Sequence, residues 1–370
     1  MARLNVRAHG GDVYAAAREL GRDPSKILDF SASINPLGPS PHAWNAITAS
    51  RRLLSHYPDP ACRDLRQALA TFWHIDPEQI VIGNGSTELI EALPRALGIH
   101  RLLVVQPTFS EYAAAMARAG EQATALYADR SDQYAIPIDR LCRVMETGRN
   151  DGRPIDGVVL CHPNSPTGQA CSADDVARLA KAVRRRGLWL VIDEAFADYC
   201  PERSVLPHAA SWPGVVVLRS MTKFYALPGL RVGYAVATHP IVRRLRRQLP
   251  PWSVCVMGQV AALAALNDAA HARKSLRFMA RERERFGTLL AALPGCVVMP
   301  TYANYFLVEL PRGRHARDIT EHLRRKGLLI RDCSSVPGTN SRSIRLAVRT
   351  VQDNDRLIRT LSRLLLQGIS

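Results

Sequence analysis

The chain has 370 residues, which exceeds the usual size of one domain and fits one large plus one small domain. Apolar residues make up 47% and charged residues 22%, as in an ordinary globular protein, and no apolar run approaches the roughly 18–20 residues of a membrane span. The first residues contain neither an apolar signal core nor a cleavage site, so we expect a cytoplasmic protein without membrane partners.

The net charge of +16 raises the question of nucleic-acid binding. Much of the arginine lies along expected helices, as in 180–187 and 241–249, and aromatic residues do not interleave with these basic runs. We therefore expect no nucleic-acid partner and consider attraction of small anionic substrates a secondary benefit. The eight cysteines contain no C-x-x-C pair, which argues against a metal site and favours free thiols in a reducing compartment.

In chain order, the first forty residues are rich in glycine and proline, and we expect this segment to lie across another part of the protein. From about residue 62, apolar runs alternate with amphipathic stretches, which predicts an α/β domain with a mostly parallel sheet covered by helices. The expected strands are 79–83, 101–107, 156–163, 187–195, 214–220 and 231–237, and the expected helices are 62–74, 86–98, 110–120 and 172–187.

The texture changes after the prolines near residue 250. A long helix over 258–295 is expected to precede strands at 302–310 and 343–350, with helices at 315–327 and 354–366, which predicts a smaller α+β domain. The predicted division is an N-terminal covering segment, 1–40, packed with the small domain; a large domain, 41–260; and a small C-terminal domain, 261–370.

Polar residues follow almost every expected strand of the large domain, where ligands bind in open parallel sheets. These stretches are Gly83–Glu88, Pro107–Phe109, Pro163–Asn164, Asp193–Glu194 and Arg219–Lys223. The sequence therefore predicts one crevice that several strand ends share.

Each feature alone has an ordinary structural explanation. Gly85–Thr87 enters a helix N-terminus that favours phosphate, but the run lacks the residues of a dinucleotide or nucleotide loop and could simply cap the helix. Asp193 ends a buried run and either caps a loop or pairs with a cation such as a protonated pyridine nitrogen. Lys223 is either solvated or bonds covalently to a cofactor. Their ordered combination favours a cofactor site.

Three motifs carry a family resemblance: SMTKFYALPGLRVGY at 220–234, HPNSPTG at 162–168 and VIDEAFADY at 191–199. With them, nearly the whole chain resembles the fold-type I pyridoxal-phosphate enzymes of the class I and II aminotransferase group. The resemblance implies pyridoxal 5′-phosphate as the cofactor, and a large mostly parallel α/β domain with a smaller α+β domain as the fold.

The resemblance also implies roles for residues at the cofactor. Lys223 would hold the cofactor covalently and carry a proton, Asp193 would pair with the pyridinium nitrogen, and Asn164 would bind the ring oxygen. The remaining implied cofactor contacts are Phe109 on the ring face and Ser86, Thr87, Ser220 and Arg231 at the phosphate. Tyr57 matches a tyrosine that reaches the phosphate site of a neighbouring subunit, which implies a homodimer.

Substrate recognition is implied to fall to the two ends of the chain. Arg345 matches the family's carboxylate-binding arginine, and Arg331 matches the arginine that takes the phosphate of phosphorylated substrates. The full set of implied substrate contacts is His9, Gly10, Asn35, Asn164, Arg331 and Arg345. Without the resemblance, we would interpret His9 as an ordinary loop histidine with no ligand, and the two arginines as ordinary strand-edge cations.

Four stretches carry a closer resemblance: HGGDVYAAARELG at 9–21, ILDFSASINPLGPSP at 27–41, LLIRDCSSVPG at 328–338 and IRLAVRT at 344–350. They resemble the subgroup that decarboxylates L-threonine O-3-phosphate in cobalamin biosynthesis, so we expect a carboxy-lyase acting on a small phosphorylated amino acid. Histidinol-phosphate aminotransferases share the scaffold and are the alternative, and a non-enzymatic relative is the third reading. Phe196 stands where the aminotransferase motif usually has tyrosine, which removes a hydroxyl from the cofactor's ring oxygen. No motif encodes which bond at the α-carbon breaks.

Overall fold

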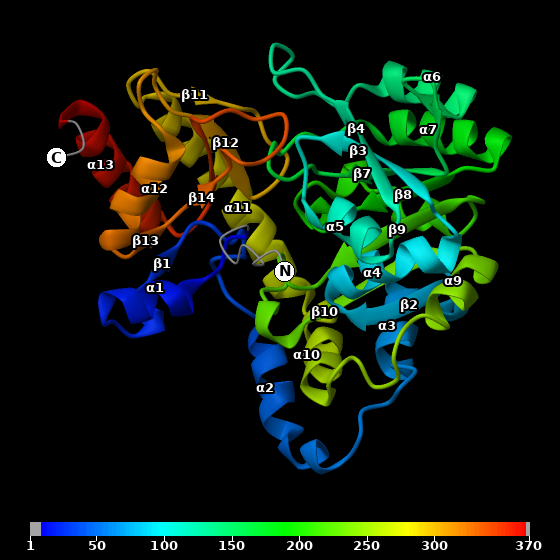
Figure 1. Ribbon diagram of the computed structural model, residues 1–370. Helices are drawn as coiled ribbons and strands as arrows, with labels where there is room; N and C mark the ends of the chain where they lie inside the picture. Colours follow the sequence, from blue (N-terminus) through cyan, green and yellow to red (C-terminus); the bar gives the residue numbers. More distant parts are fainter. Residues whose placement is uncertain (1–8, 368–370) are drawn as a thin grey trace.

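The computed structural model describes residues 9–367, which form a large and a small lobe (Figure 1). The large lobe is built on a seven-stranded sheet. Its strands, in order across the sheet, are β2 (Ile80–Asn84), β10 (Val232–Ala237), β9 (Val215–Ser220), β8 (Trp189–Asp193), β7 (Gly157–Cys161), β3 (Arg101–Gln106) and β4 (Gln122–Tyr127).

The sheet is parallel except for β10, which runs antiparallel between β2 and β9. The predicted mostly parallel α/β sheet is therefore confirmed. Because β10 is reversed, its first residue, Val232, lies opposite Asn84, the last residue of β2. The start of β10 thus shares an edge with the carboxyl ends of the parallel strands.

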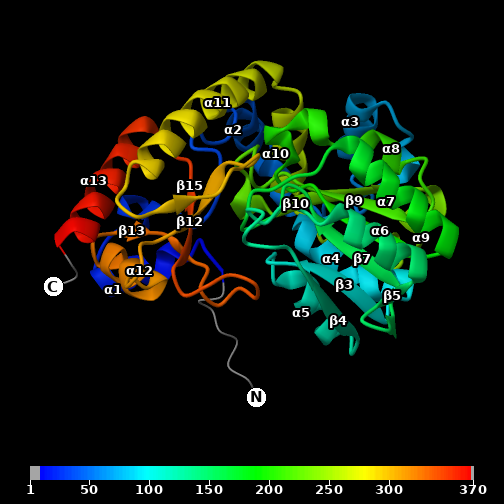
Figure 2. The ribbon, with the colours of Figure 1, turned by 90° about the horizontal axis from the view of Figure 1, so that it is seen from above.

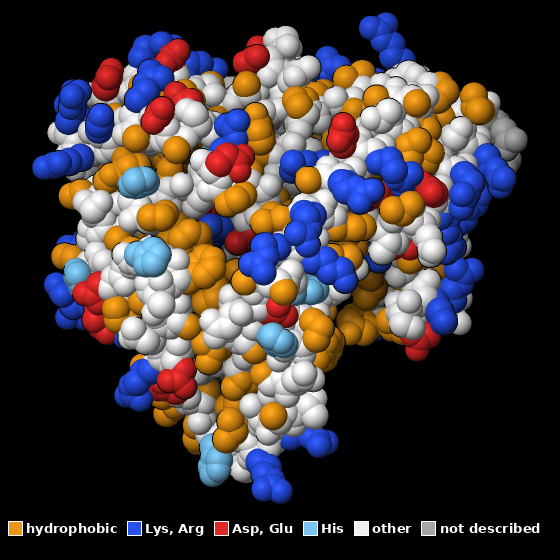
Figure 3. All heavy atoms as spheres, turned by 180° about the vertical axis from the view of Figure 1, so that it is seen from behind, with side chains coloured by type: hydrophobic (Ala, Val, Ile, Leu, Met, Phe, Trp, Pro, Cys, Tyr) orange, Lys and Arg blue, Asp and Glu red, His pale blue; other side chains and the backbone are white. Residues whose placement is uncertain are grey.

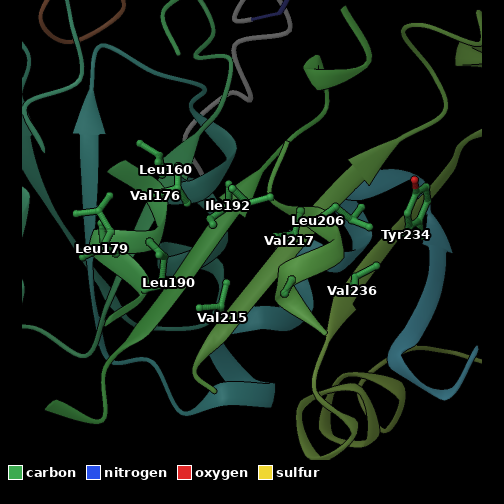
Figure 4. Packing of buried hydrophobic residues seen from close by; sticks show 14 of the residues in the cluster. Leu160, Val176, Leu179, Leu190, Ile192, Leu206, Val215, Val217, Tyr234 and Val236 are labelled. Carbon is green, nitrogen blue, oxygen red and sulfur yellow. The ribbon is translucent and has the colours of Figure 1, made fainter. Parts of the chain in front are cut away.

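Helices cover both faces of this sheet, so its strands are buried on both sides. One face packs against α3 (Arg63–Trp73), α6 (Ile138–Thr147), α7 (Ala173–Arg186), α8 (Leu206–Ala209) and α10 (Val256–Leu266). The other packs against α4 (Gly85–Leu97), α5 (Glu111–Arg118) and α9 (His239–Arg246). Figure 4 shows part of the first face, where strand residues such as Ile192 and Val217 meet Leu179 of α7 and Leu206 of α8.

The small lobe contains an antiparallel four-stranded sheet with its own apolar core. Its strands, in order, are β11 (Val297–Val298), β12 (Tyr305–Glu309), β15 (Ser343–Ala347) and β14 (Arg331–Asp332). Its helices are α11 (Ala269–Ala291), α12 (Ala316–Arg325) and α13 (Val351–Gln367). Figure 2 shows α11 along one side of this lobe, running toward α10.

The single helix predicted over 258–295 is wrong, because the chain forms α10 and α11 there instead. The break between the two helices lies at Asp268. Its side chain accepts a hydrogen bond from the backbone N–H of His271 at 3.0 Å and caps the start of α11. The predicted domain boundary at residue 260 falls inside α10, which packs on the large lobe.

The N-terminal segment joins the small lobe. It contains α1 (Val13–Leu20) and β1 (Leu28–Asp29), and β1 pairs in parallel with β13 (Leu328–Leu329). The chain then crosses to α2 (Pro41–Ala49), which contacts α10. The remaining short elements are the hairpin β5 (Arg149–Asn150) and β6 (Arg153–Pro154) and the 3₁₀ turns Pro24–Lys26, Arg51–Ser55, Pro77–Gln79, Ala197–Tyr199, Pro201–Arg203 and Pro228–Leu230.

No helix within residues 9–367 is both long enough and apolar enough to cross a membrane.

Candidate active site

The carboxyl edge of the large sheet brings most of the predicted cofactor residues together. Asp193 ends β8, Ser220 ends β9, and α4 begins at Gly85 directly after β2. Arg231 precedes the reversed strand β10 and so reaches the same edge. The strand ends that were predicted to share one crevice therefore lie along one edge of one sheet.

The N-terminus of α4 and Arg231 form a compact anion cradle. A Cβ atom on Gly85 would lie 2.6 Å from Nη2 of Arg231, so the guanidinium stands directly over the start of the helix. Arg231 itself adopts the left-handed backbone conformation, with φ of 53°. Ser220 pairs with Gly233, which packs against the start of α4, and its hydroxyl lies 2.7 Å from that of Thr222. Free helix N–H groups and a guanidinium together suit a phosphate group.

Gly233 is the tightest position behind this cradle. A Cβ atom there would lie 2.3 Å from the backbone nitrogen of Ser86 and 2.9 Å from the carbonyl oxygen of Arg219, and neither backbone can move aside cheaply. We expect Gly233→Ala to lower the free energy of unfolding by about 1–3 kcal/mol and to weaken phosphate binding at α4. Denaturant unfolding and titration with pyridoxal 5′-phosphate measure the two effects.

Gly229 is the matched control, because nothing lies within 4 Å of a Cβ atom built there. Gly229→Ala should leave both the unfolding free energy and the cofactor affinity unchanged. Equal behaviour of the two variants would show that the close packing of β10 on α4 does not shape the cradle.

Lys223 follows β9 and is half-buried, with its Nζ 5.8 Å from the centre of the Phe196 ring. Removal of Nζ from water and the positive charges of Arg345 and Arg231 lower its pKa from the ordinary lysine value to about 8. Its backbone is fixed from the N-terminal segment, since the Asn35 N–H donates to the Lys223 carbonyl at 3.0 Å. A lysine that loses its proton near pH 8 is a capable nucleophile.

Asp193 is a buried carboxylate at the centre of the edge. Its Oδ1 accepts the backbone N–H of Ala195 at 3.0 Å, and its Oδ2 accepts the hydroxyl of Tyr112 at 2.7 Å. Burial raises the pKa of Asp193, and the two hydrogen bonds and the charge of Lys223 oppose this rise. A nearby cation would therefore be held strongly by this group.

Phe109 and Asn164 lie beside these groups as predicted, but Asn164 already has partners. Its Oδ1 accepts from the Thr108 hydroxyl at 2.6 Å, and its Nδ2 donates to the carbonyl of Pro107 at 2.7 Å and to the hydroxyl of Thr167 at 2.8 Å. A hydrogen bond from Asn164 to a ring oxygen therefore requires one of these contacts to be exchanged.

Phe196 lacks the hydroxyl of the usual tyrosine, and the hydroxyl of the neighbouring Tyr305 has a different partner. Phe196 packs edge-on against Tyr305, with ring centres 4.9 Å apart. The Tyr305 hydroxyl donates instead to the backbone carbonyl of Asn164 at 2.9 Å. Tyr305 thus connects β12 of the small lobe to the Asn164 loop of the large lobe.

Arg331 and Arg345 lie side by side at the small-lobe wall, because they are directly opposed residues of β14 and β15. Arg345 donates from Nη1 to the Ser165 hydroxyl and from Nη2 to the Ser31 carbonyl, each at 2.7 Å. Its buried Nε has no hydrogen-bond partner among the described residues. Burial and the charge of Arg345 lower the pKa of Arg331. Two adjacent arginines form a site for two anionic groups.

Of the three N-terminal residues predicted to contact the substrate, His9 lies near Phe109, whereas Gly10 and Asn35 contact other parts of the protein. His9 lies 5.7 Å from Phe109 between ring centres, and its Nε2 is 2.8 Å from Oε1 of Glu111. Gly10 packs closely on the Ser31 carbonyl, leaving no space for a side chain. Asn35 is buried, and its Nδ2 donates to the Phe224 carbonyl and the Ser275 hydroxyl, so it supports the Lys223 loop.

Tyr57 is the predicted cofactor residue that lies apart from the others. It is 81% exposed and packs against Trp252, with ring centres 4.9 Å apart. Thr108 lies in the predicted strand-end stretch 107–109 but was given no role there. Three further contributors escaped prediction from the sequence: Tyr112, Ser165 and Tyr305. Ser165 lies inside the HPNSPTG motif and could have been noticed, whereas the others carry no signal beyond ordinary helix, strand and turn residues.

The donors and charges of this edge fit pyridoxal 5′-phosphate. The α4–Arg231 cradle suits its phosphate, the buried Asp193 suits its protonated ring nitrogen, and the low pKa of Lys223 suits attachment to its aldehyde. A mostly parallel sheet whose carboxyl edge carries these groups defines the class of fold-type I pyridoxal-phosphate enzymes.

The chain belongs to the aminotransferase class I and II family, whose model matches residues 25–361. It is 36% identical to the threonine-phosphate decarboxylase of Salmonella typhimurium, over 98% of each chain. It is 34% identical to the histidinol-phosphate aminotransferase of Roseiflexus castenholzii, over 93% of this chain and 91% of that protein. The crystal structure of L-threonine-O-3-phosphate decarboxylase from Porphyromonas gingivalis superposes with a TM-score of 0.80 at 25% identity, over 92% of this chain and all of that one.

Proposed function

We propose that the protein is a pyridoxal-5′-phosphate-dependent decarboxylase that converts L-threonine O-3-phosphate into (R)-1-amino-2-propanol O-2-phosphate and carbon dioxide. The observation that carries the proposal is the opposed pair Arg331 and Arg345, which suits a small substrate with two anionic groups. Similarity to a threonine-phosphate decarboxylase over 98% of the chain supports the choice of substrate. The same similarity supports a role in cobalamin biosynthesis.

In this proposal, Arg345 binds the substrate carboxylate through its unpartnered Nε and exchangeable Nη contacts, while Arg331 binds the phosphate. Lys223 Nζ would attach the cofactor, Ser86, Thr87, Ser220 and Arg231 would hold its phosphate, Phe109 would stack on its ring, and Asp193 would pair with its ring nitrogen. When bound, pyridoxal 5′-phosphate supplies an electron-accepting ring that stabilises negative charge at the α-carbon.

With Arg345 on the carboxylate and Arg331 on the phosphate, the substrate is held in a fixed orientation, which decides which bond at the α-carbon breaks. The bond to the carboxylate carbon breaks, its electron pair stays with the α-carbon, and carbon dioxide leaves. Lys223 Nζ or a water molecule then delivers a proton to the α-carbon. His9 and Gly10, held near Phe109 and Ser31, restrict the access of water from the N-terminal side.

The test is the release of carbon dioxide from L-threonine O-3-phosphate by the cofactor-loaded protein with no keto acid present. Many turnovers per site are expected. A histidinol-phosphate-type aminotransferase is the second candidate, favoured by 34% identity to such an enzyme. That candidate predicts no release of carbon dioxide, a single conversion of the cofactor to its amine form by histidinol phosphate, and continued turnover only when a keto acid is added.

The pKa of Lys223 near 8 predicts the pH dependence of cofactor attachment. Because only the uncharged amine attacks an aldehyde, the attachment rate in the apoprotein should rise from pH 6 to about pH 8 and then level off. Stopped-flow absorbance of the cofactor measures the rate. With Nα-acetyl-lysine as the control amine, whose ordinary pKa is about 10.4, the rate should keep rising to about pH 10. The same rise in the protein would contradict the lowered pKa.

We propose that the active unit is a homodimer in which Tyr57 of each subunit reaches the phosphate site of its partner. Large apolar side chains are exposed on α2, the following turn and the loop before α10: Trp44, Leu53, Leu54, Tyr57 and Trp252. Figure 3 shows hydrophobic side chains on the protruding lower part of the molecule, which contains α2. A buried dimer interface would account for this exposure.

Mixed dimers test the contribution of Tyr57. In a dimer of one Tyr57→Ala subunit and one Lys223→Ala subunit, the first subunit keeps its lysine and receives the intact tyrosine. About half of the wild-type activity per dimer is therefore expected, well above that of the Tyr57→Ala homodimer. Activity no higher than in that homodimer would show that Tyr57 acts within its own subunit.

We further infer a cytoplasmic protein with no nucleic-acid partner, consistent with eight unpaired cysteines.

A further inference from the structure

Tyr112, a residue of helix α5, contributes a hydroxyl to the site. It lies in the first turn of α5, is 2% exposed, and sits in the apolar core between α4, α5 and the sheet. A phenylalanine would fill the same space. The hydroxyl, however, donates to Oδ2 of Asp193 at 2.7 Å.

The Tyr112 ring also supports the residue predicted to stack on the cofactor. Phe109 packs edge-on against Tyr112, with ring centres 5.7 Å apart and planes at 81°. One side chain therefore contacts both Phe109, which would stack on the cofactor ring, and Asp193, which would pair with the ring nitrogen. The positions of Phe109 and Asp193 therefore depend on each other through Tyr112.

Asp193 depends on donors because it is buried among other titratable groups. Cys161 lies opposite it on β7, and burial raises the pKa of that thiol to about 12, so it stays uncharged. Glu194 follows it but lies 3.3 Å from Nε of the buried Arg219. The groups left to stabilise the Asp193 charge are the Ala195 N–H on Oδ1, the Tyr112 hydroxyl on Oδ2 and the Lys223 cation.

We infer that Tyr112 is a positioning residue whose hydroxyl keeps Asp193 ionised and oriented, so that a proton between the carboxylate and the cofactor's ring nitrogen stays on the nitrogen. The inference rests on the proposed use of Asp193 as the partner of that nitrogen, but not on which bond of the substrate breaks. Loss of the hydroxyl makes the carboxylate more basic and moves the proton toward Asp193. The ring then accepts electrons less well.

The test uses holoenzyme loaded with pyridoxal 5′-phosphate labelled with ¹⁵N in the ring. In the wild type, the ¹⁵N chemical shift at neutral pH should be that of a protonated pyridine. In Tyr112→Phe, it should move clearly toward the unprotonated value. The kcat should fall by about tenfold or more, as expected for a lost hydrogen bond to a charged group, with KM little changed.

Two comparisons separate this role from packing. Tyr234→Phe is the matched control, because it also removes a buried hydroxyl from the large lobe, where its partner at 2.9 Å is Nε1 of Trp73. It should leave the ¹⁵N shift and kcat unchanged. In an Asp193→Asn background, adding Tyr112→Phe should cause no further loss, because Tyr112 acts through Asp193. Replacement of Tyr112 by 4-aminophenylalanine, which retains a donor, should restore much of the wild-type shift even if the phenylalanine variant folds poorly.

An unchanged ¹⁵N shift in folded Tyr112→Phe, or a full additional loss in the Asp193→Asn background, would overturn the inference. An unprotonated nitrogen in the wild type would overturn both the inference and the role of Asp193. Failure of the proposed reaction is recognised separately, as a protonated nitrogen in a protein that releases no carbon dioxide.

Discussion

Lys223→Ala is expected to reduce turnover of L-threonine O-3-phosphate by on the order of 10⁴-fold or more, the scale seen when a covalent catalytic group is removed. Lys223 is the one lysine at the carboxyl edge of the sheet, and its lowered pKa makes its amine available near neutral pH. The variant should bind the cofactor only non-covalently, which absorbance and reduction with borohydride would reveal. Added ethylamine should restore part of the activity, because a small amine fills the space of the lost side chain.

The other lysines provide the control, since all of them are exposed: Lys26, Lys181, Lys274 and Lys326. Lys181→Ala, on the surface of α7, should leave turnover unchanged. A Lys223→Ala protein that keeps more than a few per cent of wild-type turnover would remove the central assignment of the site.

Arg331→Gln is expected to lower kcat/KM for L-threonine O-3-phosphate by on the order of 10²–10³-fold, about 3–4 kcal/mol, because it removes paired charge-assisted hydrogen bonds to phosphate. The much slower reaction with L-threonine, which has no phosphate, should hardly change. Arg345→Gln should impair both substrates, because both contain the carboxylate. Steady-state kinetics of the two variants on the two substrates separates the two roles.

Arg331→Lys should recover only part of the lost activity, since an ammonium group provides charge without the planar fork of a guanidinium. Arg325→Gln, an exposed residue of α12, is the matched control for net charge. Equal losses for phosphorylated and unphosphorylated threonine in Arg331→Gln would contradict the assignment of the phosphate to Arg331.

The position of the site could be predicted from the sequence because parallel strands end at one edge, and Asp193, Ser220 and Lys223 follow such strands directly. The approach of Arg231 to the start of α4 was predicted only through the family resemblance, because an apolar run such as 232–237 does not itself reveal that its strand is reversed. The direction of β10 is apparent only from its antiparallel pairing with β2 and β9.

Hydrogen-bond partners far along the chain were also beyond prediction. Tyr112 reads as a core residue of an amphipathic helix, and its partner Asp193 lies 81 positions away. Asn35 was expected to contact substrate, yet its amide donates to Phe224 and Ser275, the latter 240 positions away. The residue type determines which hydrogen bonds a side chain can donate, whereas the three-dimensional packing determines which acceptor lies within reach.

The pairing of the N-terminal segment with the small lobe also bears on how the chain is made. Ser31 and Arg345 meet across 314 positions, and Phe30 is joined to Leu329 and Ala347 by backbone hydrogen bonds. During synthesis, the large lobe can collapse around its sheet while residues 28–31 still lack partners that are made about 300 residues later. The wall that carries Arg331 and Arg345 is therefore completed only after β15 has been made, so a nascent chain that stops before β15 has the cofactor edge without the substrate wall.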